Sequence, residues 1–401
     1  MFKKINICAL FLAALSVNVS ADFYSDLAYN HAPIHYQDTD NTNARADYIT
    51  AIDYDSDWVG DNNWENLATG SLAATVYYSV VESCSHYFVT YSFFHPRDWV
   101  DAPFDGEHEN DLEGALFIIR KNGSTYGALE GVVTVFHSDF FSFAPSGSPL
   151  KSGNESIDGN VSFTSYDGSL HARTAAQAKG HGLKVWPYIG DFTGADNQDG
   201  IIYYPSRGEG EVPASGNSRS VKYKLVNLFK DNGVWQQAMH ESSLTTASAS
   251  TFASWGTFKG NTSGGCGSGA PFASCGTNSA NSPWGWNDGN DGDSYRGEFA
   301  LHPIHLTEHY FSNLGNFSRK YINNRFASDL QRAGYNSVNK PQGYSDKLDL
   351  GVLYNDLTNS CSNLFLFLQQ DLHPAAKIIL LLKIFSAVNI RKQTNLCWFP
   401  S

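Results

Sequence analysis

An acidic stretch with one histidine holds the residues of this chain whose types and spacing could do chemistry. Residues 106–121 read GEHENDLEGALFIIRK, with a histidine and four carboxylates between Glu107 and Glu113, directly before an apolar run. Side chains alternate between the two faces of a strand, so Asp111 and Glu113, which opens the strand, are expected on one face. His108 comes from the preceding loop and can fold over the same spot. Such a set suits a hard divalent cation, Mg²⁺, Mn²⁺ or Ca²⁺.

Two other interpretations of the same stretch stay open. The spacing His-x-x-Asp-x-Glu is a short pattern, and a solvated acidic loop that caps a strand would use the same residue types. A bound cation could also activate water in a secreted hydrolase, with His137 or His181 as acid or base. His137 follows the apolar run VVTVF, which favours a buried, hydrogen-bonded histidine. His181 lies between two glycines, where the backbone can approach a ligand closely.

The elements that must position this site are mainly strands. Runs at 73–81, 86–94, 113–121 and 127–136 are rich in β-branched and aromatic residues, and Asn122-Gly123 between the last two is a hairpin signal. We therefore expect a mainly β fold, an antiparallel β-sandwich with long loops and a C-terminal helical region. Further strands are expected at 199–205 and 221–229, and one helix at 319–333.

The chain divides by composition into four parts. Residues 1–21 combine two lysines, an apolar stretch and a small-residue cleavage site, which is typical of a secretory signal peptide. We expect the β-sandwich over 22–317, the helical region over 318–351 and an atypical tail over 352–401, because all 35 glycines lie at or before Gly351. The helix stripe is Ile322, Phe326 and Leu330, at four-residue spacing. The chain is expected to be secreted.

Charge and cysteine usage limit the partners. The formal net charge is −13, and loss of Lys3 and Lys4 with residues 1–21 makes it −15. Such acidity argues against nucleic acid as a partner, because phosphate binding needs basic patches. Cys8 leaves with the signal, so five cysteines remain, and Cys266 and Cys275 are expected to form a disulfide across a glycine-rich loop. No nucleophile elbow, Walker loop or dinucleotide fingerprint is present.

The acidic stretch resembles the heptapeptide Gly-His-Arg-His-Asp-Trp-Glu of the necrosis- and ethylene-inducing protein family. His108 matches its first histidine, Asp111 its aspartate and Glu113 its glutamate, whereas Asn110 and Leu112 replace the second histidine and the tryptophan. The Gly-Asp-Trp-Glu segment of the vacuolar-protein-sorting family numbered sixty-two is similar. The match covers residues 28–300 loosely.

The resemblance implies further site residues. That family binds a divalent cation with the help of an upstream aspartate, a role that Asp98 or Asp101 could take, although the offset differs. The segment AKGHGLKVWP resembles a Gly-Ser-His-Ala segment of the sorting family and places His181 near the same end. His137 is the remaining pocket candidate.

The resemblance also implies a function. It points to a cytolysin-like protein that uses the cation to bind extracellular glycans or lipid head groups in peripheral contact with a membrane. The aromatic segment WGWND (284–288) could stack on sugar rings. Whether the protein is an enzyme stays open, with binding favoured over catalysis. A secreted metal-dependent hydrolase and a non-catalytic surface adhesion protein are the alternatives.

Overall fold

The structure of the chain is a computed structural model. It describes residues 23–99, 108–187, 200–241, 249–260, 280–289, 295–356 and 361. The chain forms two compact units, Met1–Leu357 and Thr358–Ser401, and every helix and strand named below belongs to the first. The signal segment, Asp101, Cys266 and Cys275 lie outside the described residues, so those predictions stay predictions. Cys84 and Cys361 are each disulfide-bonded.

Strands dominate the described residues. They are β1 (Ile34–Gln37), β2 (Thr75–Ser83), β3 (His86–Asp98), β4 (His108–Arg120), β5 (Ala128–Phe136), β6 (Asp139–Pro145), β7 (Lys151–Ser152), β8 (Gly159–Val161), β9 (Phe163–Tyr166), β10 (Ser169–Ala176), β11 (Leu183–Val185), β12 (Ile201–Ser206), β13 (Val221–Asn227), β14 (Phe252–Ser254), β15 (Thr257–Phe258), β16 (Phe311–Ser312) and β17 (Tyr321–Asn323).

The helices are short, and one of them precedes the first strand. They are a helix over residues 23–31, the 3-10 helix η1 (Ala44–Asp47), α2 (Asn63–Asn66), α3 (Val234–Glu241), α4 (Glu298–Leu301), α5 (Pro303–Tyr310), α6 (Arg325–Arg332) and α7 (Leu350–Asp356). Of the helices in the described part of the chain, none is both long and apolar enough to cross a membrane.

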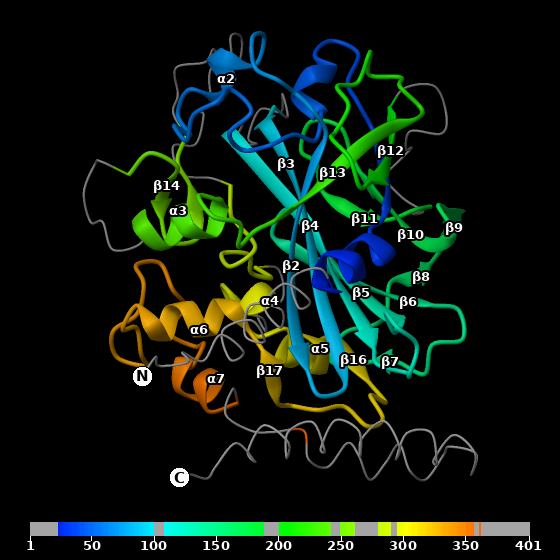
Figure 1. Ribbon diagram of the computed structural model, residues 1–401, viewed down its shortest axis with the longest axis vertical. Helices are drawn as coiled ribbons and strands as arrows, with labels where there is room; N and C mark the ends of the chain where they lie inside the picture. The colour runs from blue at the N-terminus through cyan, green and yellow to red at the C-terminus, as the bar shows by residue number, and fades with distance from the viewer. Residues whose placement is uncertain are drawn as a thin grey trace, which may run out of the picture. The chain divides into compact units, whose positions relative to one another are not determined.

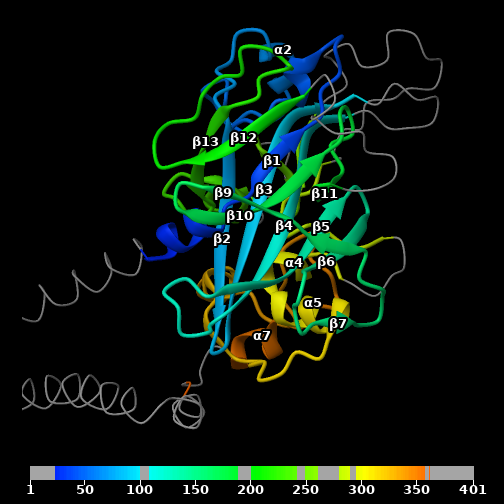
Figure 2. The same cartoon turned by 90° about the vertical axis from the view of Figure 1, so that its right-hand side faces the viewer.

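Thirteen of the strands form a single mixed sheet. Its order is β11-β10-β1-β12-β13-β2-β3-β4-β5-β6-β8, with β17 beside β2 and β9 beside β10. Figure 1 shows the long strands β2 to β5 through the centre, with α3 and α6 to one side. Figure 2, turned by 90°, shows β1, β10, β12 and β13 around the upper part of these strands. The sheet curls until β11 packs against β4 and β5, which makes it nearly barrel-shaped.

The mainly β prediction is confirmed, but the antiparallel sandwich is wrong. Four pairs in the sheet are parallel, namely β1 with β10, β12 with β13, β13 with β2, and β6 with β8. Parallel neighbours need a crossover of about a dozen residues or more, which the 207–220 segment supplies between β12 and β13. Periodicity identifies strands, but it carries no information about the direction in which distant strands pair.

The four central strands are confirmed as consecutive antiparallel neighbours. The difference lies at the acidic stretch, because β4 begins at His108 rather than at Glu113. In the pairing with β3, Asp111 lies opposite His95 and His108 lies opposite Asp98. The acidic stretch is therefore a paired part of the sheet, and His108 does not come from a loop.

The predicted helix at 319–333 is shorter than expected. The strand β17 occupies Tyr321–Asn323, and Ile322 on it is 44% exposed, so it is not part of the helix stripe. Asn324 caps the helix by accepting a hydrogen bond from the Ala327 N–H at 3.2 Å. The helix α6 then buries Phe326 and Leu330 as expected.

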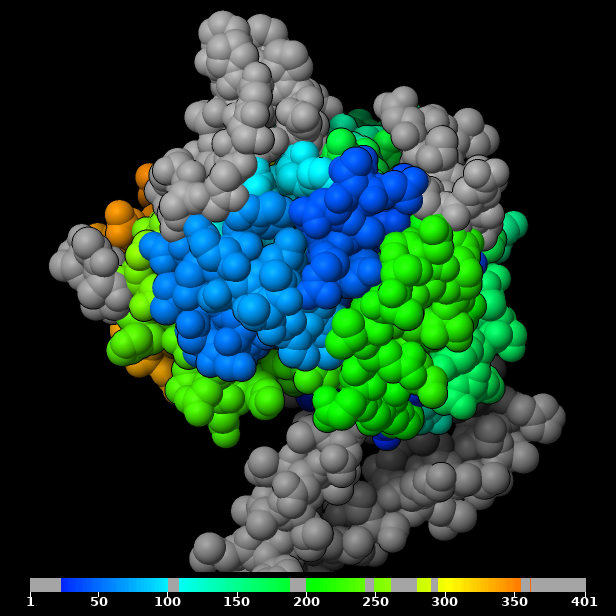
Figure 3. All heavy atoms as spheres, turned by 90° about the horizontal axis from the view of Figure 1, so that it is seen from above, coloured from blue at the N-terminus to red at the C-terminus, as the bar shows by residue number. Residues whose placement is uncertain are grey.

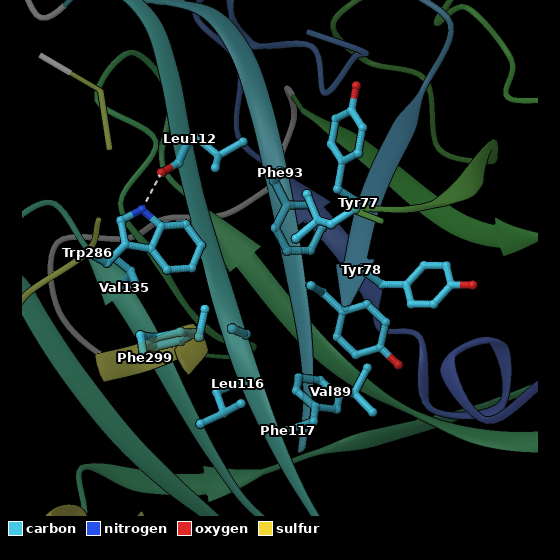
Figure 4. Packing of buried hydrophobic residues seen from close by; sticks show 14 of the residues in the cluster. Tyr77, Tyr78, Val89, Phe93, Leu112, Leu116, Phe117, Val135, Trp286 and Phe299 are labelled. Atoms are coloured by element: carbon cyan, nitrogen blue, oxygen red, sulfur yellow. Dashed lines mark hydrogen bonds between the residues drawn. The ribbon is translucent and has the colours of Figure 1, made fainter. Parts of the chain in front are cut away.

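A large aromatic core lies between the curled sheet and the helices. Figure 4 shows its part around β3, β4 and Trp286, where the Trp286 Nε1–H donates to the Leu112 carbonyl at 3.0 Å. The ring of Trp286 covers Gly114, where an added Cβ would come within 2.4 Å of the ring and of the Tyr91 carbonyl oxygen. Trp284 is fully buried and Trp286 is only 3% exposed, so the prediction that WGWND presents exposed aromatic rings is wrong.

Replacing Gly114 by alanine should destabilise the fold through this contact. Overpacking a tight core costs typically about 1–3 kcal/mol, and we expect Gly114→Ala at the upper end because one of the two close neighbours is backbone. Urea unfolding measures the loss. The matched control is Gly159→Ala on β8, where the nearest atom is 3.5 Å from the added Cβ. Equal stability of the two variants would contradict the packing of Trp286 on β4.

Candidate functional site

A residue with left-handed backbone geometry sets the direction of the acidic side chains. Asn110, in the middle of the stretch, has φ +64°, a conformation that asparagine tolerates better than most residues. Its amide Nδ2 donates to the carbonyls of Gly60 and Lys259, both at 2.6 Å, and its Oδ1 accepts from Asn63 at 2.5 Å. The bend interrupts the alternation of the strand, so His108 shares a side with Asp111 and Glu113.

The residues on the other side of the bend are structural. Glu109 is 2% exposed, and its Oε1 accepts a hydrogen bond from the Trp64 N–H at 2.7 Å. Together with Asn110 it holds the 60–64 segment against the edge of the sheet. One part of the acidic stretch thus anchors a loop, which leaves His108, Asp111 and Glu113 for the site.

These three side chains line a pocket of about 240 Å³ at the N-terminal end of β4. His137 and Ser138 line it from the turn between β5 and β6, and Asn281 lines it from the segment before Trp286. Figure 3 looks down on this end of the molecule, where the segments around residues 40–70 and 200–225 border each other. The pocket is smaller than a typical drug-sized site, so it suits a small polar ligand.

Asp111 is held in place by a fully buried histidine. The His181 Nδ1 lies 2.9 Å from Asp111 Oδ2, and its Nε2 lies 3.1 Å from Asp47 Oδ1. No part of His181 is exposed, so it lies behind the carboxylate and does not line the pocket. The imidazole of His95 stacks on that of His181, with the ring centroids 3.8 Å apart. The His181 imidazole bridges two carboxylates that would otherwise repel each other.

The electrostatics of this bridge favour the charged forms. Burial lowers the pKa of His181, but the hydrogen bonds and charges of Asp111 and Asp47 outweigh it and raise that pKa to about 9. Burial raises the pKa of Asp111, yet the hydrogen bond from His181 and the charge of His108 bring it below its ordinary value. Asp111 is therefore an ionised carboxylate at neutral pH.

Only one of the two carboxylate oxygens of Glu113 accepts a hydrogen bond from the described residues. Its Oε1 accepts from the His137 N–H at 3.0 Å, while its buried Oε2 has no hydrogen-bond partner among the described residues. Burial and the neighbouring charge of Asp111 raise the pKa of Glu113 well above its ordinary value. An unpaired buried carboxylate oxygen costs free energy that a bound group at this position would recover.

His108 completes the lining with a second unused atom. Its Nε2 lies 3.7 Å from Asp98 Oδ2, and its buried Nδ1 has no hydrogen-bond partner within the described parts of the chain. Asp98 is 8% exposed and lies beside His108, outside the lining of the pocket. The structure therefore brings together His108, Asp111 and Glu113 and places Asp98 one contact away.

His137 differs from its expected environment. A buried histidine was favoured, but the side chain is 41% exposed at the rim of the pocket, with its Nδ1 3.9 Å from Glu113 Oε1. The backbone explains this position, because His137 has φ +59° in the tight turn between β5 and β6 and is no longer part of the strand. Its Nε2 lies 3.0 Å from the Gln177 amide.

Two residues that position the site carried no signal in the sequence. Asp47 ends η1 and is fully buried, yet ARAD in an otherwise polar region has no motif. Its carboxylate accepts hydrogen bonds from the Lys179 N–H at 2.8 Å and the Trp99 Nε1–H at 3.1 Å. His95 sits in the run YSFFHPRDW and reads as an ordinary strand residue. Asp47 and His95 are recognised as part of the site only in the folded structure, where both are buried polar side chains.

The side chains of His108, Asp111 and Glu113 are of the types that bind a hard divalent cation, but they are not placed closely enough to coordinate one. Two carboxylates and an imidazole are ligands that Mg²⁺, Ca²⁺ or Mn²⁺ accept, and an oxygen of Glu113 and a nitrogen of His108 are unused. Among the residues that the structure describes, no group of three or more histidine, cysteine or acidic side chains is placed closely enough to hold a metal ion. The further candidate Asp101 lies outside them.

The polar interior behind the pocket makes the fold sensitive to acid. His35 is fully buried, its Nδ1 lies 3.0 Å from Thr174 Oγ1 and its Nε2 3.2 Å from Gln37 Oε1. Phe93 and Tyr203 stack on the imidazole, and the charge of His181 acts on it. Burial lowers the pKa of His35 to about 3, so the folded protein keeps this imidazole neutral.

We expect the contribution of His35 to the free energy of unfolding to decrease as the pH falls. The unfolded chain takes up a proton on this residue near pH 6.5, whereas the folded chain does so only near pH 3. The contribution of His35 is thus intact above pH 6.5 and falls by up to about 5 kcal/mol as the pH drops toward 3.

Urea unfolding of His35→Asn and wild type, compared at several pH values, measures this contribution. The difference between the two should shrink across the window from pH 6.5 to 3. The control is His240→Gln, an exposed histidine at the end of α3. A difference that does not change with pH would show that His35 is not kept neutral in the folded protein.

The chain was compared with family models, with curated proteins and with solved structures. No protein-family model matches the chain, and no curated protein matches it. Among solved structures, one described as "Toxin fold for microbial attack and plant defense" matches at 17% identity over 41% of this chain and 69% of that chain, with a TM-score of 0.23.

Two further solved structures match at a similar level. Necrosis and Ethylene inducing Protein 2, from the causal agent of cocoa's witches' broom disease, has 15% identity over 42% of this chain and 71% of that chain, with a TM-score of 0.24. NLPPya in complex with glucosamine has 16% identity over 41% and 67%, with a TM-score of 0.26. Superpositions this poor carry no argument about activity, and the vacuolar-protein-sorting resemblance stays a prediction. The chain is distantly similar to necrosis- and ethylene-inducing proteins, the family that its acidic stretch resembles.

Proposed function

We propose that this chain is a secreted protein that binds the sugar of an extracellular glycan or glycolipid through a divalent cation held in the β4 pocket. The observation that carries the proposal is the pair of unused buried atoms, Glu113 Oε2 and His108 Nδ1, beside the ionised Asp111. A cation at this point would give both carboxylates a counter-charge and use an oxygen that otherwise has no partner.

The residues that would hold the cation differ in their ionisation and in how firmly they are oriented. Asp111 is already ionised and oriented by His181, so it would serve as the fixed ligand. Glu113 would exchange its proton for the metal, because burial and Asp111 raise its pKa. His108 would turn its ring to present one nitrogen. When bound, the cation supplies positive charge and open positions for hydroxyl oxygens of a ligand.

The rest of the pocket favours a sugar over an anionic group. Hydroxyl and amide groups of Ser138 and Asn281 and the half-exposed imidazole of His137 offer hydrogen bonds to a small polyhydroxylated ring. The chain carries a formal net charge of −13, which repels phosphate-bearing lipid head groups. A neutral or amino sugar, free or as the head group of a lipid, fits both observations.

Removing the cation should lower the stability of the protein. A ligand that binds only the folded state at 100 times its Kd adds about 2.7 kcal/mol. Thermal unfolding of the purified protein with Mg²⁺, Ca²⁺ or Mn²⁺ and with EDTA measures this shift, and metal analysis gives the stoichiometry. We expect wild type to respond and both Asp111→Asn and Glu113→Gln to lose the response.

A matched control lies on the same strand. Glu109→Gln makes the same change of charge on the other side of β4, where the carboxylate binds the Trp64 N–H, so its metal response should persist. If wild type, Glu109→Gln and Glu113→Gln all melt alike with metal and with EDTA, the cation proposal is wrong.

Sugar binding should need both the cation and the free volume of the pocket. We expect neutral and amino monosaccharides to bind wild type in the presence of metal by calorimetry, and EDTA to abolish this binding. Ser138→Phe would fill the pocket from the β5–β6 turn, so it should lose the sugar and keep the metal shift. Sugar binding that survives both EDTA and Ser138→Phe would place the ligand elsewhere on the protein.

The same pocket allows a test of the hydrolase alternative. His137 has an exposed imidazole with Nδ1 3.9 Å from Glu113 Oε1, so it is placed to accept or donate a proton at the rim of the pocket, where a cation held by His108, Asp111 and Glu113 would supply positive charge. Incubation of wild type with short oligosaccharides, followed by assay of new reducing ends, distinguishes the two activities. Turnover that His137→Gln abolishes would make the protein an enzyme, and binding without turnover supports the proposed function.

A further inference from the structure

Four asparagine sequons lie on the surface of the described part of the chain. The triplets Asn-x-Ser begin at Asn122, Asn154, Asn160 and Asn316, with glycine, glutamate, valine and phenylalanine at the middle position. All four asparagines are exposed. In a secreted protein this triplet is an acceptor for N-linked oligosaccharides when the middle residue is not proline.

All four sequons lie toward the end of the sheet that is remote from the pocket. The strand β4 runs 13 residues from His108 at the pocket to Arg120, roughly 40 Å at about 3.3 Å per residue. Asn122 lies two residues after Arg120, and Asn316 is near this end because the Arg120 guanidinium donates to the Leu314 carbonyl at 2.8 Å. Figure 1 shows β7 and β16 beside the lower part of β4 and β5.

The other two sequons follow β6 away from the pocket. That strand begins at Asp139, next to the pocket residue Ser138, and ends at Pro145. Asn160 lies on β8 opposite Ala144, near the far end of β6. Asn154 lies in the connection between β7 and β8, where its backbone N–H donates to the His309 carbonyl. The pocket end therefore carries none of the four.

The asparagines differ in whether their amide nitrogen is available. Asn122 uses only its Oδ1, which accepts from the Ser124 N–H at 3.1 Å and the Ser124 hydroxyl at 2.7 Å. On β8, Asn160 is exposed while its neighbour Val161 is buried, so the asparagine points outward. In contrast, the Asn154 Nδ2 lies 3.0 Å from the Nδ1 of His309, which is only 7% exposed. A sugar on that nitrogen would crowd His309.

We infer that Asn122, Asn160 and Asn316 carry N-linked oligosaccharides and that Asn154 does not. The inference uses the export that is part of the proposed function, because the transferring enzyme acts in the secretory pathway. The oligosaccharide comes from a lipid diphosphate donor. The bond from sugar C1 to the diphosphate oxygen breaks, a bond from C1 to the asparagine Nδ2 forms, the amide loses a proton, and the lipid diphosphate leaves.

Glycans at these positions would act by exclusion. They would cover the far end of β4, β5 and β8 with bulky hydrated groups, and none of the four sequons of the described residues lies at the β4 pocket. Modification at these three positions would therefore leave the lining of the pocket unchanged.

The test is site mapping on the full chain secreted from eukaryotic cells. Enzymatic release of N-glycans in heavy-oxygen water marks each modified asparagine as labelled aspartate in the peptide masses. We expect the label at Asn122, Asn160 and Asn316, and one glycan fewer by gel mobility in each of Asn122→Gln, Asn160→Gln and Asn316→Gln. Asn154→Gln is the matched control and should migrate as wild type. An unlabelled protein, or label at Asn154 in place of the other three, would overturn the inference.

A second form of the chain separates this inference from the proposed function. Replacing residues 1–21 by a leader of known export ensures entry into the secretory pathway even where the natural segment fails. The cation-dependent thermal shift is then measured before and after glycan removal. Glycans without a cation shift refute the cation proposal alone, and a cation shift without glycans refutes the glycosylation inference alone.

Discussion

A histidine held between two buried carboxylates is the interaction on which the site depends. His181 and Asp47 are fully buried and Asp111 is 5% exposed, so none of the three charges is well solvated. Buried ion pairs are tolerated only when further hydrogen bonds satisfy them, and removal of one partner leaves an uncompensated charge. The Trp99 indole and the Lys179 backbone serve Asp47 in this way. The bridge ties η1, β4 and the loop before β11 into one unit, so the orientation of Asp111 is fixed by segments far apart in the sequence.

Local patterns predicted the elements of the fold better than their arrangement. The runs that became β2, β3, β4 and β5 pair in order through short connections, so periodicity and the Asn122-Gly123 turn were enough. The mixed sheet was not predictable in this way, because β12 and β13 reach their parallel neighbours through long connections. The early start of β4 was missed for a different reason. Charged residues argue against a strand unless their partners are known, and those partners, Trp64 and His181, come from elsewhere in the chain.

The sequence identified three of the residues that line the pocket, but it did not identify Asp47 and His95, which lie behind them. The spacing of His108, Asp111 and Glu113 placed the three at one pocket, although the reason is the bend at Asn110 and not strand alternation alone. Both glycines around His181 suggested close approach of backbone to a ligand, yet the residue has φ +55° and is fully buried behind Asp111. Asp47 could not be found, because a lone buried aspartate looks the same in sequence as a solvated one.

Some residues of the acidic stretch stabilise the fold, whereas others reduce its stability. Glu109 and Asn110 bury their polar groups completely in contacts with the 60–64 loop and Lys259, so they stabilise the edge of the sheet. Glu113 and His108 each keep a buried atom that has no hydrogen-bond partner among the described residues, which costs free energy in the folded chain. Local stability gained by the first pair permits the cost at the second, as is common where strain or unsatisfied groups gather at functional sites. A chain selected for stability alone would have closed this pocket, so the unused atoms are the part of the stretch that stability does not explain.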